Sequence, residues 1–378
     1  MNLQACRANA WRKLLVVLLV LTVIGGLLFH AGGSTGLSGF KWPSFWDSIR
    51  NAHHGLLILA LVAMYATYAI RTLRWVRFSR HLGQLDFFGI YASTLIGFTT
   101  LFVLGRVGEP IRPLLIARRE RTSVSAMLGI YVLERLFDAA SAVVLFGVSL
   151  LMFPHLVLTE HNAEAWLGVA RTTGAVMLFS LMAAVVFLLY FRLHGARALD
   201  RRLEAWRARL GCHARNAGWF KRFSQGLQGI RSFGDLAEGI AYSAAHWILV
   251  AFIYLWIAWS FGGDLAQLDF PSALLVLAFS LVGSTVQLPG VGGGSQVASF
   301  LAFTLFLGVD KEAAAAAAIT LWLITFAGCS LAGVPLMIRE GWSMGELRRL
   351  ARAKNEGEAK GSQLVAPARA NRPGAEAP

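Results

Sequence analysis

The sequence predicts an all-α, polytopic membrane helix bundle, and three observations lead to that prediction. Hydrophobic residues make up 56% of the 378 residues, against about 45–50% apolar residues in an ordinary soluble domain. They gather in long runs, several of which approach the roughly 20 residues that a helix needs to cross the hydrocarbon core. Arginines border these runs, as in loops held against an anionic cytoplasmic leaflet. The membrane therefore explains the net charge of +14, and we expect no nucleic-acid partner.

Nine apolar runs follow one another along the chain, and they differ in length. Six are long enough, or nearly so, to cross the membrane as single helices: 14–29, 55–70, 124–153, 165–190, 236–261 and 313–338. Three are short or end in Gly- and Pro-rich breaks: 87–104, 271–288 and 297–307. Non-helical backbone is tolerated inside the bilayer only where protein or water satisfies it, so these three runs call for a different arrangement.

The distribution of arginines selects the topology. If the run 87–104 crossed the membrane alone, the arginines between Arg106 and Arg121 would lie outside, against the positive-inside rule. We therefore expect this run and the segment after it to form a re-entrant hairpin. The runs 271–288 and 297–307 form a second one from the opposite face. The result is about six full crossings plus two hairpins, about eight membrane segments, with both termini cytoplasmic.

This order suggests two halves of inverted topology. The run 55–70, the first hairpin and the run 124–153 form one half, and the run 236–261, the second hairpin and the run 313–338 form the other. Interrupted segments in corresponding positions of inverted halves indicate a transport site near the membrane midplane. The alternative is that the glycines only allow close helix packing.

The rest of the chain is assigned by composition. Residues 1–350 are expected to form a single transmembrane domain that includes a basic segment, 192–235, lying on the cytoplasmic membrane surface. Residues 353–378 are rich in Ala, Gly, Pro and charge, and we expect them to be a disordered tail. Cys6, Cys212 and Cys329 show no metal-ligand spacing, so no metal or cofactor is expected.

The first break, 105–113, carries charge beside an apolar hairpin. Arg106 and Arg112 are suited to bind a phosphate in bidentate fashion, and Glu109 is suited to orient an arginine or to meet a cationic head group. The alternative is a cytoplasmic loop with solvated charges. Because charge at this depth is costly unless it is paired or wetted, the break is a candidate head-group site.

Three ionisable residues lie inside the run 124–153, at a position near mid-membrane. Glu134 and Asp138 share a helix face, and Arg135 and Asp138 form an i, i+3 pair. Ionisable groups inside a membrane helix indicate a functional site by default. A buried structural ion pair is the alternative, and both interpretations are compatible.

The second break has no charge. Its backbone N–H groups are candidates for cradling an anion, as glycine nests do, although no Gly-Lys-Ser/Thr follows that would make it a P-loop. We interpret His53, His54 and His246 as structural residues near helix ends. No nucleophile–base pair is evident, so no catalytic residue is assigned. The candidate residues of this break are Pro289, Gly292, Gly293, Gly294, Ser295 and Gln296.

Two motifs resemble a known family. Gly-Glu-x-x-Arg-Pro at 108–113, followed by Glu-Arg-x-x-Asp at 134–138, is similar to the pattern of flippase-like membrane proteins named for the transmembrane region of lysylphosphatidylglycerol synthase. The resemblance covers roughly residues 10–340. The matching positions are Gly108, Glu109, Arg112, Pro113, Glu134, Arg135 and Asp138.

The resemblance implies that the protein moves a polar-headed lipid, a phospholipid or a polyprenyl-linked lipid, between the leaflets of an inner or plasma membrane. The alternatives are a membrane enzyme acting on a lipid head group and a non-transporting accessory protein of envelope lipid synthesis. Partners would be anionic or polyprenyl lipids, with envelope-synthesis enzymes or a second copy as further candidates. No soluble aminoacyl-transferring domain is expected. Two departures from the family pattern are Gln296, where many relatives have glutamate, and a missing arginine near Trp322 or Leu323.

Overall fold

The computed structural model describes two large parts of the chain. The described residues are 39–83, 85–152, 179, 222, 223, 225–227, 229, 230, 232–288, 290–342, 345 and 346. The predicted runs 14–29 and 165–190, the tail 353–378 and most of the basic segment 192–235 lie outside them.

The described residues are almost entirely helical, which confirms the all-α class. Helices α2 to α6 in the first part are α2 (Trp42–Arg50), α3 (His54–Ser79), α4 (Phe87–Leu104), α5 (Ile111–Arg119) and α6 (Val124–Met152). Those in the second part are α9 (Phe233–Ser260), α10 (Phe270–Gly283), α11 (Gly294–Leu301), α12 (Lys311–Trp322) and α13 (Ser330–Arg339). The strands β1 (Gln287–Leu288) and β2 (Gly292–Gly293) form one short antiparallel turn.

Among the described residues, four helical segments are long and apolar enough to cross a membrane. They are His54–Leu82, Phe87–Leu104, Phe233–Ser260 and Lys311–Arg339. Shorter apolar helices cover Phe270–Gly283 and Gly294–Phe306. Together with the 29-residue α6, they form the bundle of a multi-pass membrane protein.

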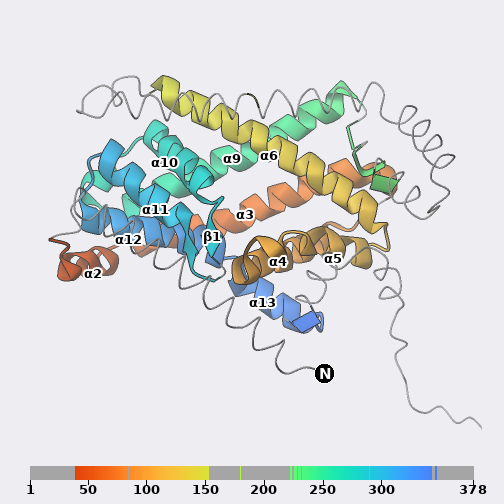
Figure 1. The fold of residues 1–378 in the computed structure, drawn as a ribbon, viewed down its shortest axis with the longest axis horizontal. Helices are drawn as coiled ribbons and strands as arrows, with labels where there is room; N and C mark the ends of the chain where they lie inside the picture. Colours follow the sequence, from red (N-terminus) through yellow and green to blue (C-terminus); the bar gives the residue numbers. More distant parts are fainter. Residues whose placement is uncertain are drawn as a thin grey trace, which may run out of the picture.

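The bundle has two distinct ends, set by the antiparallel pair α3 and α9 (Figure 1). At one end the backbone N–H of His53 donates to the carbonyl of Ser260 at 2.7 Å. At the other, Arg80 forms an ion pair with Asp235. We call the second the arginine end, because Arg77 and Arg80 lie there, and the first the acidic end, because it leads to Asp264 and Asp269.

α4 and α5 form a helical hairpin whose two feet stand at the arginine end. The Asp86 carboxylate caps α4 by accepting from the N–H of Gly89 at 2.7 Å, and α4 stops at Gly105, where φ is +66°. α5 then returns along α4. A Cβ on Gly97 would stand 2.6 Å from the Cβ of Arg112, so this glycine permits the close approach.

α10 and α11 form a second hairpin whose feet stand at the acidic end. Asp269 caps α10 there, directly after α9, and the β1–β2 turn forms the tip. The two tips meet, because the N–H of Gly290 donates to the carbonyl of Phe102 at 2.9 Å. Figure 1 shows β1 beside the end of α4. The two hairpins thus enter the bundle from opposite ends. That the two hairpins are re-entrant and enter the membrane from opposite faces stays a prediction.

Three differences from the predicted elements have physical causes. α3 runs on to Ser79, so Arg71 and Arg74 are helical and buried rather than part of a loop. α2 was not predicted, because its nine residues are too few for a membrane run. The predicted helix 313–338 is interrupted by a π-helical turn at Leu323–Ala327 between α12 and α13.

Candidate functional site

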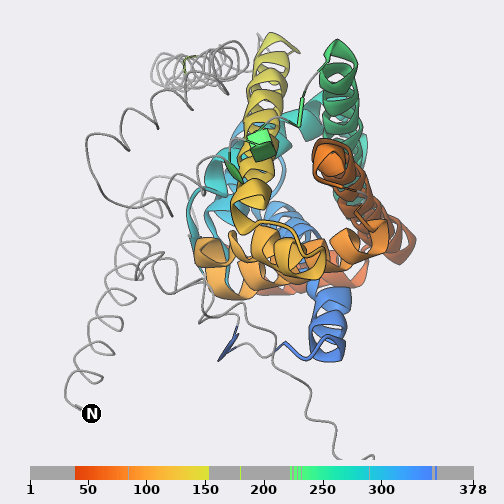
Figure 2. The same cartoon turned by 90° about the vertical axis from the view of Figure 1, so that its right-hand side faces the viewer.

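Charged side chains from three helices and a histidine from a fourth meet inside the bundle, and we call this group the arginine cluster. α3 and α9 lie side by side there, and α6 and the α4–α5 hairpin pack close to them (Figure 2). The members of the cluster are Arg71 and Arg74 of α3, Arg112 of α5, Glu134, Arg135 and Asp138 of α6, and His246 of α9.

Glu134 is the centre of the cluster and is fully buried, with 0% of its surface exposed. Its carboxylate accepts from Arg71 at 2.8 Å and from Arg74 at 3.2 Å. Arg112 approaches it with both terminal nitrogens, one of them at 3.3 Å. This carboxylate therefore ties α6 to both α3 and α5.

Asp138 lies one helical turn beyond Glu134 and is served by an overlapping set of arginines. It accepts from Arg71 at 2.9 Å and from Arg74 at 2.8 Å, and it pairs with Arg135 at 3.0 Å. The i, i+4 spacing places both carboxylates on the α6 face that contacts α3. The two carboxylates thus hold the arginines of α3 in one fixed arrangement.

Aromatic rings enclose the Arg112 guanidinium. Its central carbon stands 4.9 Å from the ring centre of Trp75 and 5.3 Å from that of Phe98. Tyr131 contacts both Arg112 and Arg135, at 5.7 Å and 5.2 Å, and its hydroxyl donates to Glu109 at 2.7 Å. Aromatic rings of this kind stabilise a desolvated cation. The N–H groups of the guanidinium lie in its own plane and can still donate hydrogen bonds there.

The second part of the chain contributes two polar groups from α9. Arg71 lies 2.9 Å from the Nε2 atom of His246, and Arg74 donates to the hydroxyl of Ser243 at 2.7 Å. His246 sits in the middle of α9, not near a helix end as expected from the sequence. Arg71, Arg74 and His246 were missed as site residues. For Arg71 and Arg74, the feature that could have indicated a shared helix face is their i, i+3 spacing in a continuing helical pattern.

The cluster carries a surplus of positive charge among the described side chains. The cluster holds four arginines (Arg71, Arg74, Arg112 and Arg135) and two carboxylates (Glu134 and Asp138), and even with Glu109, which Tyr131 joins to its edge, the difference is 4 − 3 = +1. Arg135 is the most accessible of the four, with 41% of its side chain exposed. A cationic surplus inside a membrane protein is costly unless an anion or water compensates it.

The remaining residues predicted for the first break have structural roles or lie outside the description. Gly108 packs against the backbone of Thr100, where a Cβ would clash. Pro113 lies buried in the first turn of α5. The side chain of Arg106 is outside the described part of the chain, so its predicted role stays a prediction.

The residues of the second break shape the tip of the second hairpin. Gln296 folds back on the turn, where it accepts from the N–H of Gly293 and donates to the carbonyl of Val291 at 3.1 Å. Gly292 lies against the indole of Trp322, and Gly294 lies against Gly283. Ser295 is buried, and Pro289 lies outside the described residues. Among the described residues, no hydrogen bond, ion pair or ring contact joins this turn directly to the arginine cluster.

The turn nevertheless adjoins the cluster along α4. Phe98 contacts Arg71 and Arg112, and Phe102, one turn further, contacts Gly290 and Trp322. Both breaks therefore lie around the same half of α4. Within the described ranges, no three His, Cys, Asp or Glu side chains gather as metal ligands would.

Comparison with known proteins gives one match. Residues 13–333 match the family described as the lysylphosphatidylglycerol synthase TM region. The chain belongs to this family. No curated protein and no solved structure matches it. Membership of the lysylphosphatidylglycerol synthase TM-region family confirms the resemblance drawn from the two motifs. It identifies the chain as a multi-pass membrane protein involved in lipid handling.

Proposed function

We propose that this protein binds the anionic head group of a phospholipid or polyprenyl-linked lipid at the arginine cluster and moves that lipid between the leaflets of the inner or plasma membrane. The supporting observation is the surplus of arginine over carboxylate inside the bundle. A phosphate is the natural counter-charge, because guanidinium groups bind it in bidentate, charge-assisted fashion.

Arg135 is the group best placed to reach the head group. Its partner Asp138 is also held by Arg71 and Arg74, so Arg135 can leave that carboxylate without stranding it. Its half-exposed side chain needs little further desolvation to meet a phosphate. The other arginines then supply the positive field behind it.

The meeting of the two hairpin tips supports movement rather than binding alone. Each hairpin reaches the middle of the bundle from a different end, and the tips touch at Phe102 and Gly290. Interrupted segments that meet in this way provide a site to which either side can open in turn. Each carboxylate accepts a hydrogen bond from arginine or tyrosine, which favours binding over acid–base chemistry.

A transport assay with a graded head-group variant tests the proposal. The full chain is reconstituted in liposomes with a fluorescent anionic phospholipid, and its movement is followed by quenching of the outer leaflet. We expect Arg135→Gln to slow movement about 10- to 100-fold, since a lost charge-assisted hydrogen bond costs about 1.5–3 kcal/mol. Arg135 suits the test because the buried arginines Arg74 and Arg112 hold the fold together.

Arg77→Gln is the matched control. Arg77 is another half-exposed arginine, and its ion pair with Glu238 lies outside the cluster. We expect this variant to transport at the wild-type rate. If wild-type protein moves the lipid no faster than empty liposomes, or if folded Arg135→Gln protein matches wild type, the proposal is wrong.

A further inference from the structure

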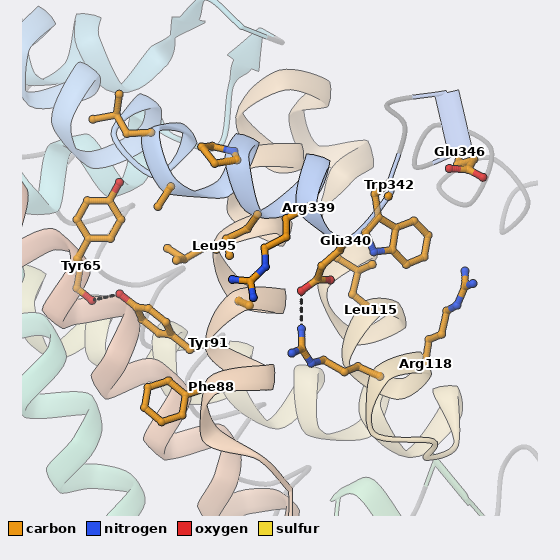
Figure 3. A pocket seen from close by; sticks show the side chains of 17 residues that line it. Tyr65, Phe88, Tyr91, Leu95, Leu115, Arg118, Arg339, Glu340, Trp342 and Glu346 are labelled. Carbon is orange, nitrogen blue, oxygen red and sulfur yellow. Dashed lines mark hydrogen bonds and ion pairs between the residues drawn. The ribbon is translucent and has the colours of Figure 1, made fainter.

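A groove of about 1090 Å³ lies between α4, α5 and α13 and shares no residue with the arginine cluster (Figure 3). Its volume is slightly above the range usual for small-molecule sites, about 300–1000 Å³. Figure 3 shows charged side chains at one end of the groove and tyrosine and phenylalanine rings at the other.

The charged end is lined by three arginines (Arg118, Arg119 and Arg339) and two glutamates (Glu340 and Glu346), a difference of 3 − 2 = +1. Arg119 is paired with Glu340, and the Arg118 guanidinium lies 4.6 Å from the ring centre of Trp342. Among the described residues no carboxylate lies within ion-pair distance of Arg118 or Arg339. Both guanidinium groups are therefore open to an anion.

The other end is apolar and aromatic. Phe88, Tyr91 and Leu95 of α4 form one wall, and residues of α13 form the opposite wall. The Tyr91 hydroxyl donates to the carbonyl of Tyr65 at 3.2 Å, so this polar group already has a partner and the ring adds apolar surface to the wall. The α13 residues are Leu331, Ala332, Pro335 and Leu336.

We propose that this groove holds an anionic glycerophospholipid that is distinct from the transported lipid. Its phosphate meets Arg118 and Arg339 beside Trp342, and an acyl chain runs along the α4 and α13 walls. Basic pockets between transmembrane helices bind anionic head groups in this manner, and tryptophan favours the head-group level. Two other occupants fit less well. A soluble anion would leave the apolar wall uncovered, and an apolar helix would cover the arginines without pairing their charge.

Lipid counting by native mass spectrometry tests the head-group end. Purified full-length protein is titrated with phosphatidylglycerol or phosphatidylcholine in detergent. We expect one tightly bound phosphatidylglycerol, and about tenfold weaker binding in Arg118→Gln/Arg339→Gln, for the loss of charge-assisted contacts. The matched control, Arg50→Gln/Arg121→Gln, removes two exposed arginines outside the groove lining and should bind like wild type.

A second variant tests the apolar end without changing charge. Ala332→Phe fills the groove between the walls, whereas Ala266→Phe places the same ring on an exposed site at the acidic end. We expect only Ala332→Phe to displace the lipid. Brominated phosphatidylglycerol should quench wild-type tryptophan fluorescence more than that of Trp342→Phe, which places the lipid beside Trp342.

Equal binding of phosphatidylglycerol and phosphatidylcholine would overturn the proposal, because the groove would then hold only bulk lipid. Unchanged binding in the Arg118/Arg339 double variant would overturn it as well. Complete displacement by inorganic phosphate would show a soluble-anion site instead. None of these readouts depends on transport. The proposal for the groove can therefore be wrong while the transport proposal holds, and the transport proposal can be wrong while the groove still binds lipid.

Discussion

Glu134 shows how a single residue can organise a membrane bundle. It is fully buried, and its carboxylate accepts from arginines of α3 and α5 while its backbone belongs to α6. Association of helices in lipid lacks the hydrophobic drive available in water, so interhelical hydrogen bonds carry more of the specificity. The same carboxylate therefore serves both the fold and the candidate site.

Neutralising Glu134 should destabilise the protein strongly. Glu134→Gln removes a buried negative charge that Arg71, Arg74 and Arg112 share. Because these buried arginines lose a counter-charge, the free energy of unfolding should fall by about 3–5 kcal/mol. Thermal unfolding in detergent, followed by circular dichroism, measures the fall in Tm.

Glu238→Gln is the control for this prediction, because it breaks the exposed pair with Arg77. Exposed ion pairs contribute little, so its Tm should stay near that of wild type. Equal Tm values for the two variants would contradict a central role for Glu134.

Four of the seven residues of the arginine cluster were predicted from the sequence as site residues. The motif residues Arg112, Glu134, Arg135 and Asp138 are brought together as the motif spacing and the family resemblance suggested. Arg71 and Arg74 follow the predicted run 55–70 and were left among the arginines that border the apolar runs, because the positive-inside rule treats such arginines as markers of the membrane edge. That rule cannot recognise an arginine whose counter-charge comes from a helix about 60 residues away, at Glu134.

At the scale of elements, the contact between hairpin tips is the feature most sensitive to a small change. Gly292 has φ +85°, and a Cβ at this position would clash with the Trp322 indole and with Gln296. The tip of the second hairpin therefore fits against α12 only with glycine here. Phe102 of α4 packs on the same indole, with ring centres 5.6 Å apart.

Gly292→Ala should loosen the junction of the hairpins and lower the Tm in detergent by a measurable amount. In a Trp322→Ala background the same substitution should cost less, since the clash with the indole is gone. The positive φ and the contact with Gln296 remain unfavourable for alanine, so part of the cost should persist. Additive losses in the double variant would show that the two residues do not interact.

Elements were predicted with uneven success for a physical reason. The run 87–104 coincides with α4, because Asp86 and Gly105 mark its ends by capping and by a left-handed turn. The break in the last helix was not visible, since the π-helical turn Leu323–Ala327 continues an apolar stretch without Gly or Pro. The turn follows Trp322, which is held by both hairpin tips.

At the scale of the whole molecule, the two ends of the bundle differ in arginine and lysine content. The arginine end collects the last turns of α3, α5 and α13, joined by contacts such as the Arg119–Glu340 ion pair. The acidic end joins α2 to the start of α12, where the N–H of Lys41 donates to Glu312 at 2.8 Å. Arginines of the first end include Arg77, Arg80, Arg118, Arg119, Arg121 and Arg339, whereas the described cations of the second are Lys41, Arg50 and Lys311.

This difference predicts which end faces the cytoplasm. The positive-inside rule places the richer end inside, so Arg121 should be cytoplasmic and Arg50 should lie on the opposite side. Arg121→Cys and Arg50→Cys, each in a background lacking Cys6, Cys212 and Cys329, form a matched pair of exposed sites. An impermeant maleimide should label Arg50→Cys in intact spheroplasts and Arg121→Cys only in inverted membrane vesicles.

The labelling pattern also decides whether the first hairpin is re-entrant. Both feet of the α4–α5 hairpin stand at the arginine end, so a cysteine at Leu85, before α4, must be labelled from the same side as one at Arg121. Labelling of these two positions from opposite sides would make α4 a full crossing and would remove the inverted arrangement of the hairpins. The re-entrant arrangement predicts that both of these positions are labelled from one side of the membrane. Gln267→Cys, at the foot of the second hairpin, should be labelled from the other side. That result would place the two hairpin tips between the two membrane faces. A head group moving across the membrane would then have to pass the arginine cluster.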